Sequence, residues 1–101
     1  MATKRKIKTT AYDSADFLSS KEAVHTYLSE ALATDDATFI AHALGTVARA
    51  RGMTRIAKKA GLSRESLYKA LSSDGNPEFG TIIRVMQALG LKLSLQTAAG
   101  R

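Results

Sequence analysis

The segment of residues 53–71 restricts the possible folds of this chain more than any other part of it. Apolar residues recur in this segment at helical spacing on both sides of a glycine, and glycine can adopt the left-handed backbone that a tight turn requires. The positions that would join two short helices here are Ala57, Gly61, Leu62, Leu67 and Leu71. Ala57 is small enough to let the second helix cross the first one closely. The pattern therefore predicts a helix-turn-helix.

The second helix of this motif would present polar side chains on its outer face. Its predicted base-reading residues are Arg64, Glu65 and Lys69. Arginine can bond guanine through two donors, and a carboxylate can accept from the amino group of cytosine. Cations and hydroxyls suited to the DNA backbone surround these residues, namely Arg51, Arg55, Lys58, Lys59, Ser63, Ser66 and Tyr68. The predicted partner of this face is double-stranded DNA.

Charge is unevenly distributed along the chain, whose formal net charge is +6. Residues 1–10 carry +4, residues 11–48 carry −5 and residues 49–69 carry +6. Such a division suggests two partners of opposite charge, with a polyanion near residues 49–69. Solvated helix faces would produce the same distribution, so charge alone leaves both interpretations open.

Helical periodicity predicts five helices, over residues 21–33, 36–50, 53–60, 64–71 and 79–89. Ser19 and Glu22 form a capping box before the first helix, and Asp35 and Asp36 suit the start of the second. Gly45 lies inside the second helix, where it would allow a close backbone approach. The predicted apolar stripes include Val24, Leu28, Ala31, Phe39, Leu44, Val47, Ile56, Phe79, Ile82, Val85, Met86 and Leu89.

The segment after the last helix has the periodicity of a β-strand. Leu91, Leu93 and Leu95 alternate with polar residues, so one face of an extended chain would be apolar. A lone strand cannot satisfy its own backbone hydrogen bonds. We therefore expect pairing with the same strand of a second protomer, which makes a homodimer, or with a partner protein. A frayed, extended tail is the alternative.

These elements predict an all-α, five-helix domain with a short C-terminal β-strand. Residues 1–18 form a basic arm and N-terminal extension, residues 19–97 form the DNA-binding domain, and residues 98–101 form a tail. The chain has no cysteine, no secretory signal and no apolar stretch of about 20 residues, so we expect a cytoplasmic protein without a membrane segment.

Enzymatic activity is not expected. Neither His25 nor His42 lies in a cluster with metal-ligand spacing, and the serines have no histidine base near them in the pattern. A glycine-rich phosphate loop is also absent from the sequence. The sequence therefore indicates no catalytic residue, no metal, no cofactor and no small-molecule substrate.

Several stretches resemble known families. Residues 46–97 resemble the lambda-repressor-like, or Cro/CI-type, DNA-binding domain. The chain from about residue 12 to residue 95 resembles the addiction-module antidote family, the antitoxins of HigBA-type toxin-antitoxin modules. The matching stretches are residues 12–13, 17–18, 43–45, 48–53, 56–57, 64–71, 75–77 and 88–91, of which 64–71 and 75–77 are the most distinctive. The basic arm of residues 1–10 has no counterpart in this resemblance.

The resemblance implies a lambda-repressor-like fold and a transcriptional repressor that binds an operator in its own operon as a dimer. It also implies that the protein neutralises a small, basic toxin of the RelE superfamily. Two other functions stay open. One is a stand-alone Cro/CI-type regulator without a toxin, and the other is a toxin inhibitor that acts through protein interaction alone.

Overall fold

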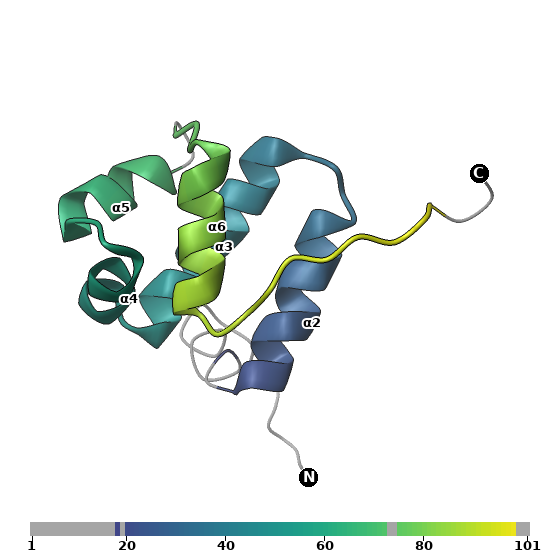
Figure 1. Cartoon of the computed structure of the whole chain (residues 1–101), viewed down its shortest axis with the longest axis horizontal. Coiled ribbons are helices and arrows are strands. Elements are labelled where there is room, and N and C mark those ends of the chain that lie inside the picture. The colour runs from purple at the N-terminus through teal and green to yellow at the C-terminus, as the bar shows by residue number, and fades with distance from the viewer. Residues whose placement is uncertain (1–17, 19, 73–74, 99–101) are drawn as a thin grey trace, which may run out of the picture.

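A computed structural model describes residues 18, 20–72 and 75–98. Every regular element in these ranges is a helix, which confirms the all-α expectation for them. The five helices are α2 (Lys21–Leu32), α3 (Ala37–Arg51), α4 (Met53–Ala60), α5 (Arg64–Ala70) and α6 (Phe79–Ala88), as Figure 1 shows. None of them is long and apolar enough to cross a membrane. The expected basic arm and tail residues 99–101 lie outside the described residues.

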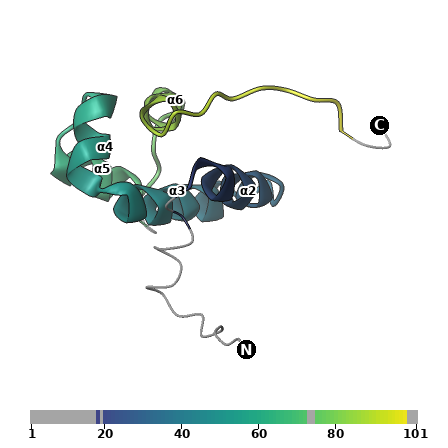
Figure 2. The same ribbon diagram turned by 90° about the horizontal axis from the view of Figure 1, so that it is seen from below.

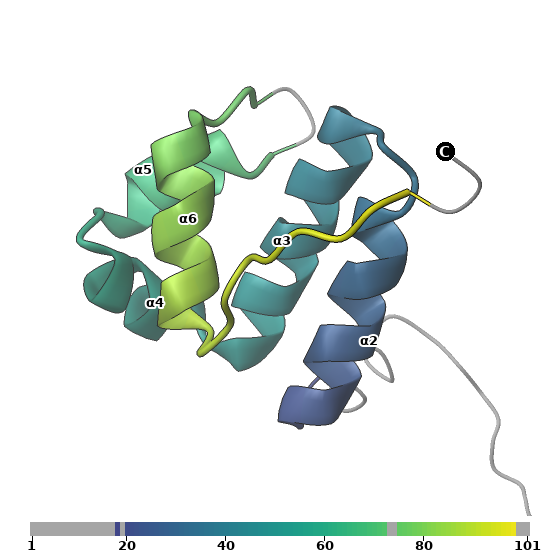
Figure 3. The ribbon, with the colours of Figure 1, turned by 45° about the vertical axis from the view of Figure 1, so that its right-hand side comes forward.

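The helices divide between two ends of the molecule. Helices α2 and α3 lie side by side at one end, and α4 and α5 lie at the other, in both Figure 1 and Figure 2. Helix α6 packs on α4 and returns the chain toward the first pair, and the C-terminal segment then crosses α2 and α3 (Figure 3). The fully buried side chains come from both ends and include Leu18, Val24, Leu28, Leu44, Val47, Leu67, Leu71 and Val85. One core therefore holds both helix pairs together.

Side-chain caps start the first two helices. Asp36 begins α3 as expected, because its Oδ1 accepts hydrogen bonds from the backbone N–H groups of Thr38 and Phe39 at 3.1 and 3.2 Å. The cap of α2 is Ser20 rather than Ser19, whose proposed capping box is wrong. Helix α2 begins at Lys21, so Ser20 directly precedes it and its Oγ accepts from the N–H of Ala23 at 3.1 Å.

Glycines in the left-handed conformation end α4 and α6, and the one after α4 was expected for the turn. Gly61 has φ 74° and Gly90 has φ 79°. Beyond each glycine the next N–H returns to the helix: Leu62 donates to the carbonyl of Ala57 at 2.9 Å, and Leu91 donates to that of Met86 at 2.8 Å. These turns reverse the chain within two residues of each helix end.

Two aromatic residues that were expected in the core are exposed. Phe79 is 72% exposed and Phe39 is 46% exposed, whereas Val85 and Met86 on the same stripe as Phe79 are buried. Both phenylalanines lie in the first turn of their helices. A terminal turn has neighbours on fewer sides than the middle of a helix, so apolar periodicity overestimates burial there.

The strand expected at residues 91–96 does not form within the described chain. Leu91 and Leu93 are half-buried against the core, but Leu95 is 96% exposed. After Leu91, the backbone of the segment makes no hydrogen bond to the backbone of another described residue. The physical reason is that a strand exists only with a partner, and no described part of this chain supplies one.

The expectation for Gly45 leads to a first testable prediction. A Cβ at this position would lie 2.9 Å from the carbonyl oxygen of Leu71, so α3 approaches the end of α5 through the glycine. We expect Gly45→Ala to lower the free energy of unfolding by about 1–3 kcal/mol, because backbone must shift to admit the methyl group.

Gly80 is the matched control for this prediction, because it also lies in a helix but would bring its Cβ within 4 Å of no other atom. Gly80→Ala should leave stability unchanged or raise it by up to about 1 kcal/mol. Urea denaturation followed by circular dichroism measures both variants. Equal effects of the two substitutions would contradict the close approach at Gly45.

Candidate nucleic-acid interface

Helices α4 and α5 and the turn between them form a unit of residues 53–71, here named the α4–α5 unit. Of the positions predicted to join its helices, Ala57, Leu67 and Leu71 are buried, and Leu62 is half-buried. Gly61 forms the turn. Leu67 is completely inaccessible to solvent, and it is the only buried residue within α5. The other residues of α5 are exposed, except for Ala70, which is half-buried.

The outer face of α5 carries the predicted base-reading residues. Arg64, Glu65 and Lys69 are all exposed, as are Ser66 and Tyr68. In a helix of seven residues anchored by one leucine, these side chains share a surface that no described part of the chain covers. Helix α5 therefore presents an uncovered polar face to solvent.

Two serines close the first turn of α5. The Oγ of Ser63 accepts from the N–H of Ser66 at 2.9 Å, and the two hydroxyl oxygens lie 2.9 Å apart. Ser63 is therefore the N-cap of α5, and the hydroxyls predicted to contact phosphate lie at the start of the helix. Removal of such a cap destabilises a helix by about 1 kcal/mol.

Arg64 lies over the ring of Tyr68, with its guanidinium carbon 5.5 Å from the ring centre. This cation–π contact restricts the arginine to one region of the outer face. The sequence interpretation assigned Tyr68 to the DNA backbone and missed the contact. The spacing of four residues on a predicted helix was the signal that could have revealed it.

Helix α4 and the end of α3 before it carry further cations. Arg55, Lys58 and Lys59 are exposed on α4, and Arg51 is half-buried at the end of α3. The structure adds Arg84, which the sequence interpretation missed. Its Nη1 lies 3.9 Å from the position that a Cβ on Gly61 would occupy, so α6 places a further guanidinium beside the turn. No local pattern could reveal this residue, because it lies one helix farther along the chain.

Acidic side chains gather at the other end of the molecule. Glu22 and Glu30 are exposed on α2, and Asp35 and Asp36 are exposed in the turn before α3. Figures 1 and 2 place α2 at the end opposite α4 and α5. The folded domain therefore has a basic end and an acidic end.

The two histidines are exposed on separate helices, His25 on α2 and His42 on α3. Across the described ranges, no three histidine or acidic side chains come close enough together to hold a metal ion.

Comparison with known proteins identifies a family that the chain matches. Residues 8–97 match the model of a family described as "Probable addiction module antidote protein". The chain is also 51% identical over 85 residues to an uncharacterised protein of Haemophilus influenzae, an alignment that covers 84% of this chain and 88% of that protein. No solved structure matches the chain.

Proposed function

Because this chain belongs to the family of probable addiction module antidote proteins, we propose that it is an antitoxin that represses its own operon through a helix-turn-helix. The α4–α5 unit is this motif, within a lambda-repressor-like domain. One observation carries the proposal: buried Leu67 anchors α5 while Arg64, Glu65 and Lys69 all face solvent on it. A helix seated in this way can enter the major groove.

The exposed side chains divide into those that contact bases and those that contact the DNA backbone. Arg64 bonds guanine, Glu65 accepts from cytosine, and Lys69 contacts a further base edge. Phosphate contacts come from the surrounding cations and hydroxyls, which are Arg51, Arg55, Lys58, Lys59, Ser63, Ser66 and, beside the turn, Arg84. Phosphate contacts set affinity and register, and base contacts set the sequence that is read.

Repression follows from occlusion of the promoter by a homodimer on a palindromic operator. Two recognition helices separated by one turn of DNA lie about 34–36 Å apart. The segment with Leu91, Leu93 and Leu95 is the surface through which the protomers pair, since its backbone leaves an edge open.

The toxin partner is a small, basic protein of the RelE superfamily, as the acidic end of the domain supports. Glu22 and Glu30 lie exposed there with Asp35 and Asp36, far from the DNA-reading face. Opposite charges steer association and favour one partner over another. The separation of the two ends lets one molecule hold toxin and operator together.

Two measurements on one preparation test this function. The chain is co-expressed with the product of the neighbouring gene, purified through a tag on that product, and footprinted on the upstream DNA. Capture of a short basic protein together with a protected palindrome supports the proposal. Capture without a footprint would contradict the proposal in favour of a toxin inhibitor that acts through protein interaction alone. A footprint without capture would contradict it in favour of a stand-alone regulator.

Charge reversal at the acidic end should weaken toxin binding. We expect the double variant Glu22→Lys/Glu30→Lys to raise the toxin dissociation constant about tenfold or more at low salt, because like charges then face each other. Calorimetry at two ionic strengths measures the change, and DNA affinity should not fall.

The control for charge reversal is Glu65→Lys/Glu78→Lys, which alters net charge equally on exposed residues outside the acidic end. Toxin affinity that drops by the same factor in both double variants would show a response to net charge only.

A further inference from the structure

The C-terminal segment leaves the body of the domain with an open backbone edge. The N–H of Leu91 still bonds the carbonyl of Met86, at 2.8 Å, but residues 92–98 make no backbone hydrogen bond to the backbone of another described residue. Each of these residues carries a strong donor and a strong acceptor. Such an edge is a template for pairing with another strand.

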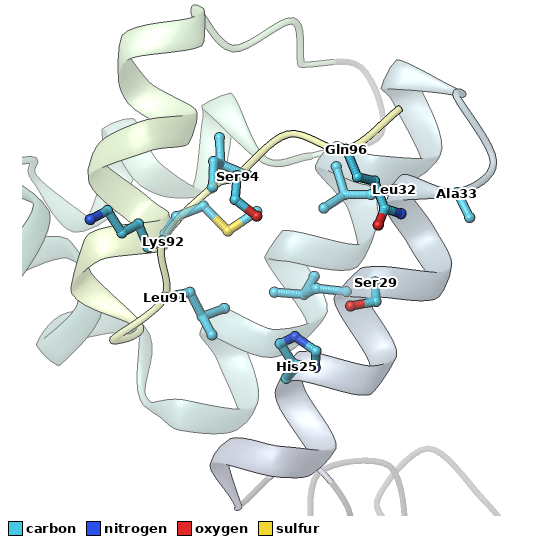
Figure 4. Close-up of a pocket in the computed structure, with 11 residues that line it drawn as sticks. His25, Ser29, Leu32, Ala33, Leu91, Lys92, Ser94 and Gln96 are labelled. Atoms are coloured by element: carbon cyan, nitrogen blue, oxygen red, sulfur yellow. The ribbon is translucent and has the colours of Figure 1, made fainter. Parts of the chain in front are cut away.

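A groove of about 520 Å³ lies beside this edge, between the segment and α2 (Figure 4). Its α2 wall consists of His25, Leu28, Ser29, Leu32 and Ala33, and its other wall consists of Met86 with residues 91–94 and 96. Helix α2 therefore does not close against the segment. The open space runs along the part of the segment where a paired strand would lie.

Two leucines around the groove lack apolar cover. Leu95 is 96% exposed, and Leu32 on the groove wall is 37% exposed. Leu93, two residues before Leu95, lines the groove and is half-buried. Leu93 and Leu95 share one face of an extended chain, so a groove that receives the first can receive the second from another molecule.

We propose that a second copy of this chain occupies the groove, with the two segments paired antiparallel around a two-fold axis at Ser94. This register places Leu95 of the second copy opposite Leu93 and against Leu32, and the two-fold axis repeats the contact in reverse. The inference rests on the homodimer of the proposed function and specifies its interface. Each protomer then covers the exposed leucines of the other.

The segment's own side chains suit a second copy as the occupant. Lys92 lines the groove, and the Nζ of Lys21 lies near its end, 3.5 Å from the position of a Cβ on Gly90. A second copy brings the same cations, so the register must keep them apart. In the antiparallel register, Lys92 lies opposite the neutral Gln96 rather than opposite a second lysine.

Cysteine substitution tests the register directly, because the chain has no cysteine of its own. Ser94 is exposed, and Ser94→Cys would face its symmetry mate at a distance that a disulfide can span. We expect this variant to cross-link to a covalent dimer under mild oxidation. Lys92→Cys and Gln96→Cys should not cross-link alone, but they should cross-link to each other when mixed.

A second variant tests the leucine contact without disturbing the protomer. Leu95 is almost fully exposed, so Leu95→Asp removes no contact within the chain. We expect it to raise the dimer dissociation constant at least about tenfold, toward the 10.8 kDa monomer in sedimentation equilibrium. Gln96→Asp, with the same added charge one residue away, should remain dimeric, because it faces Lys92.

The remaining outcomes separate this inference from the proposed function. A wild-type dimer in which Ser94→Cys stays uncross-linked and Leu95→Asp has no effect overturns the interface but leaves the homodimer in place. Cross-linking of Lys92→Cys to Ser94→Cys overturns the register. A wild-type chain that is monomeric both free and on DNA removes the homodimer itself. Loss of toxin binding in Leu95→Asp, with a monomeric wild type, assigns the groove to the toxin.

Discussion

Replacement of Leu67 by alanine is expected to lower the free energy of unfolding by about 2–5 kcal/mol, the usual cost of a cavity at a fully buried leucine. Leu67 has no solvent exposure and is the only buried residue within α5. The substitution therefore removes most of the contact that seats this helix. Since native domains are stable by only about 5–15 kcal/mol, the variant should lose much of its stability.

Urea denaturation followed by circular dichroism measures the loss, and Lys69→Ala is the control on the same helix. Lys69 is exposed, so its truncation should change stability by no more than about 0.5 kcal/mol. A Leu67→Ala variant that unfolds at the same urea concentration as Lys69→Ala would show that α5 is held by other contacts. Operator binding should fall in the leucine variant at temperatures where its unfolded fraction becomes appreciable.

The second large effect concerns Arg64. We expect Arg64→Ala to weaken operator binding by about 1–3 kcal/mol, which is about 5- to 150-fold in the dissociation constant, and to relax preference at one base pair. Tyr68→Ala should produce part of the same loss, because the ring lies under the guanidinium 5.5 Å away, and Tyr68→Phe should retain the ring and most of the affinity.

Fluorescence anisotropy on the footprinted operator and on its single-base variants provides the measurement. Lys21→Ala is the matched control, because it removes the same charge from an exposed position on α2, at the other end of the molecule. If Arg64→Ala lowers affinity for every sequence equally and the base preference is unchanged, Arg64 holds the backbone and does not read a base.

Capping residues and helical periodicity predicted the helices well, because both act over a few residues. Asp35 and Asp36 were expected at the start of a helix through its dipole, and Gly61 was expected in the turn. Both positions depend on interactions that reach only a few residues, including the side-chain cap that Asp36 forms. The same rules erred by one residue at Ser19, where Ser20 is the cap. Two adjacent serines offer the same chemistry, and only the position of the first helical turn chooses between them.

Helical periodicity also predicted much of the candidate site. Arg64, Glu65 and Lys69 could be assigned to the outer face of α5 because Leu67 and Leu71 mark its inner face with helical periodicity. Tyr68 beneath Arg64 was within reach of that periodicity as well.

The sequence by itself determined where the helices begin and end and which face of α5 is polar, because capping and periodicity operate over one or two turns. Tertiary packing alone decided that Arg84 lies beside the turn at Gly61, that Phe79 stays exposed, and that acidic and basic side chains separate to opposite ends. Each of these depends on which segments, distant in the sequence, come into contact. Capping and periodicity act over one or two turns and do not encode such contacts.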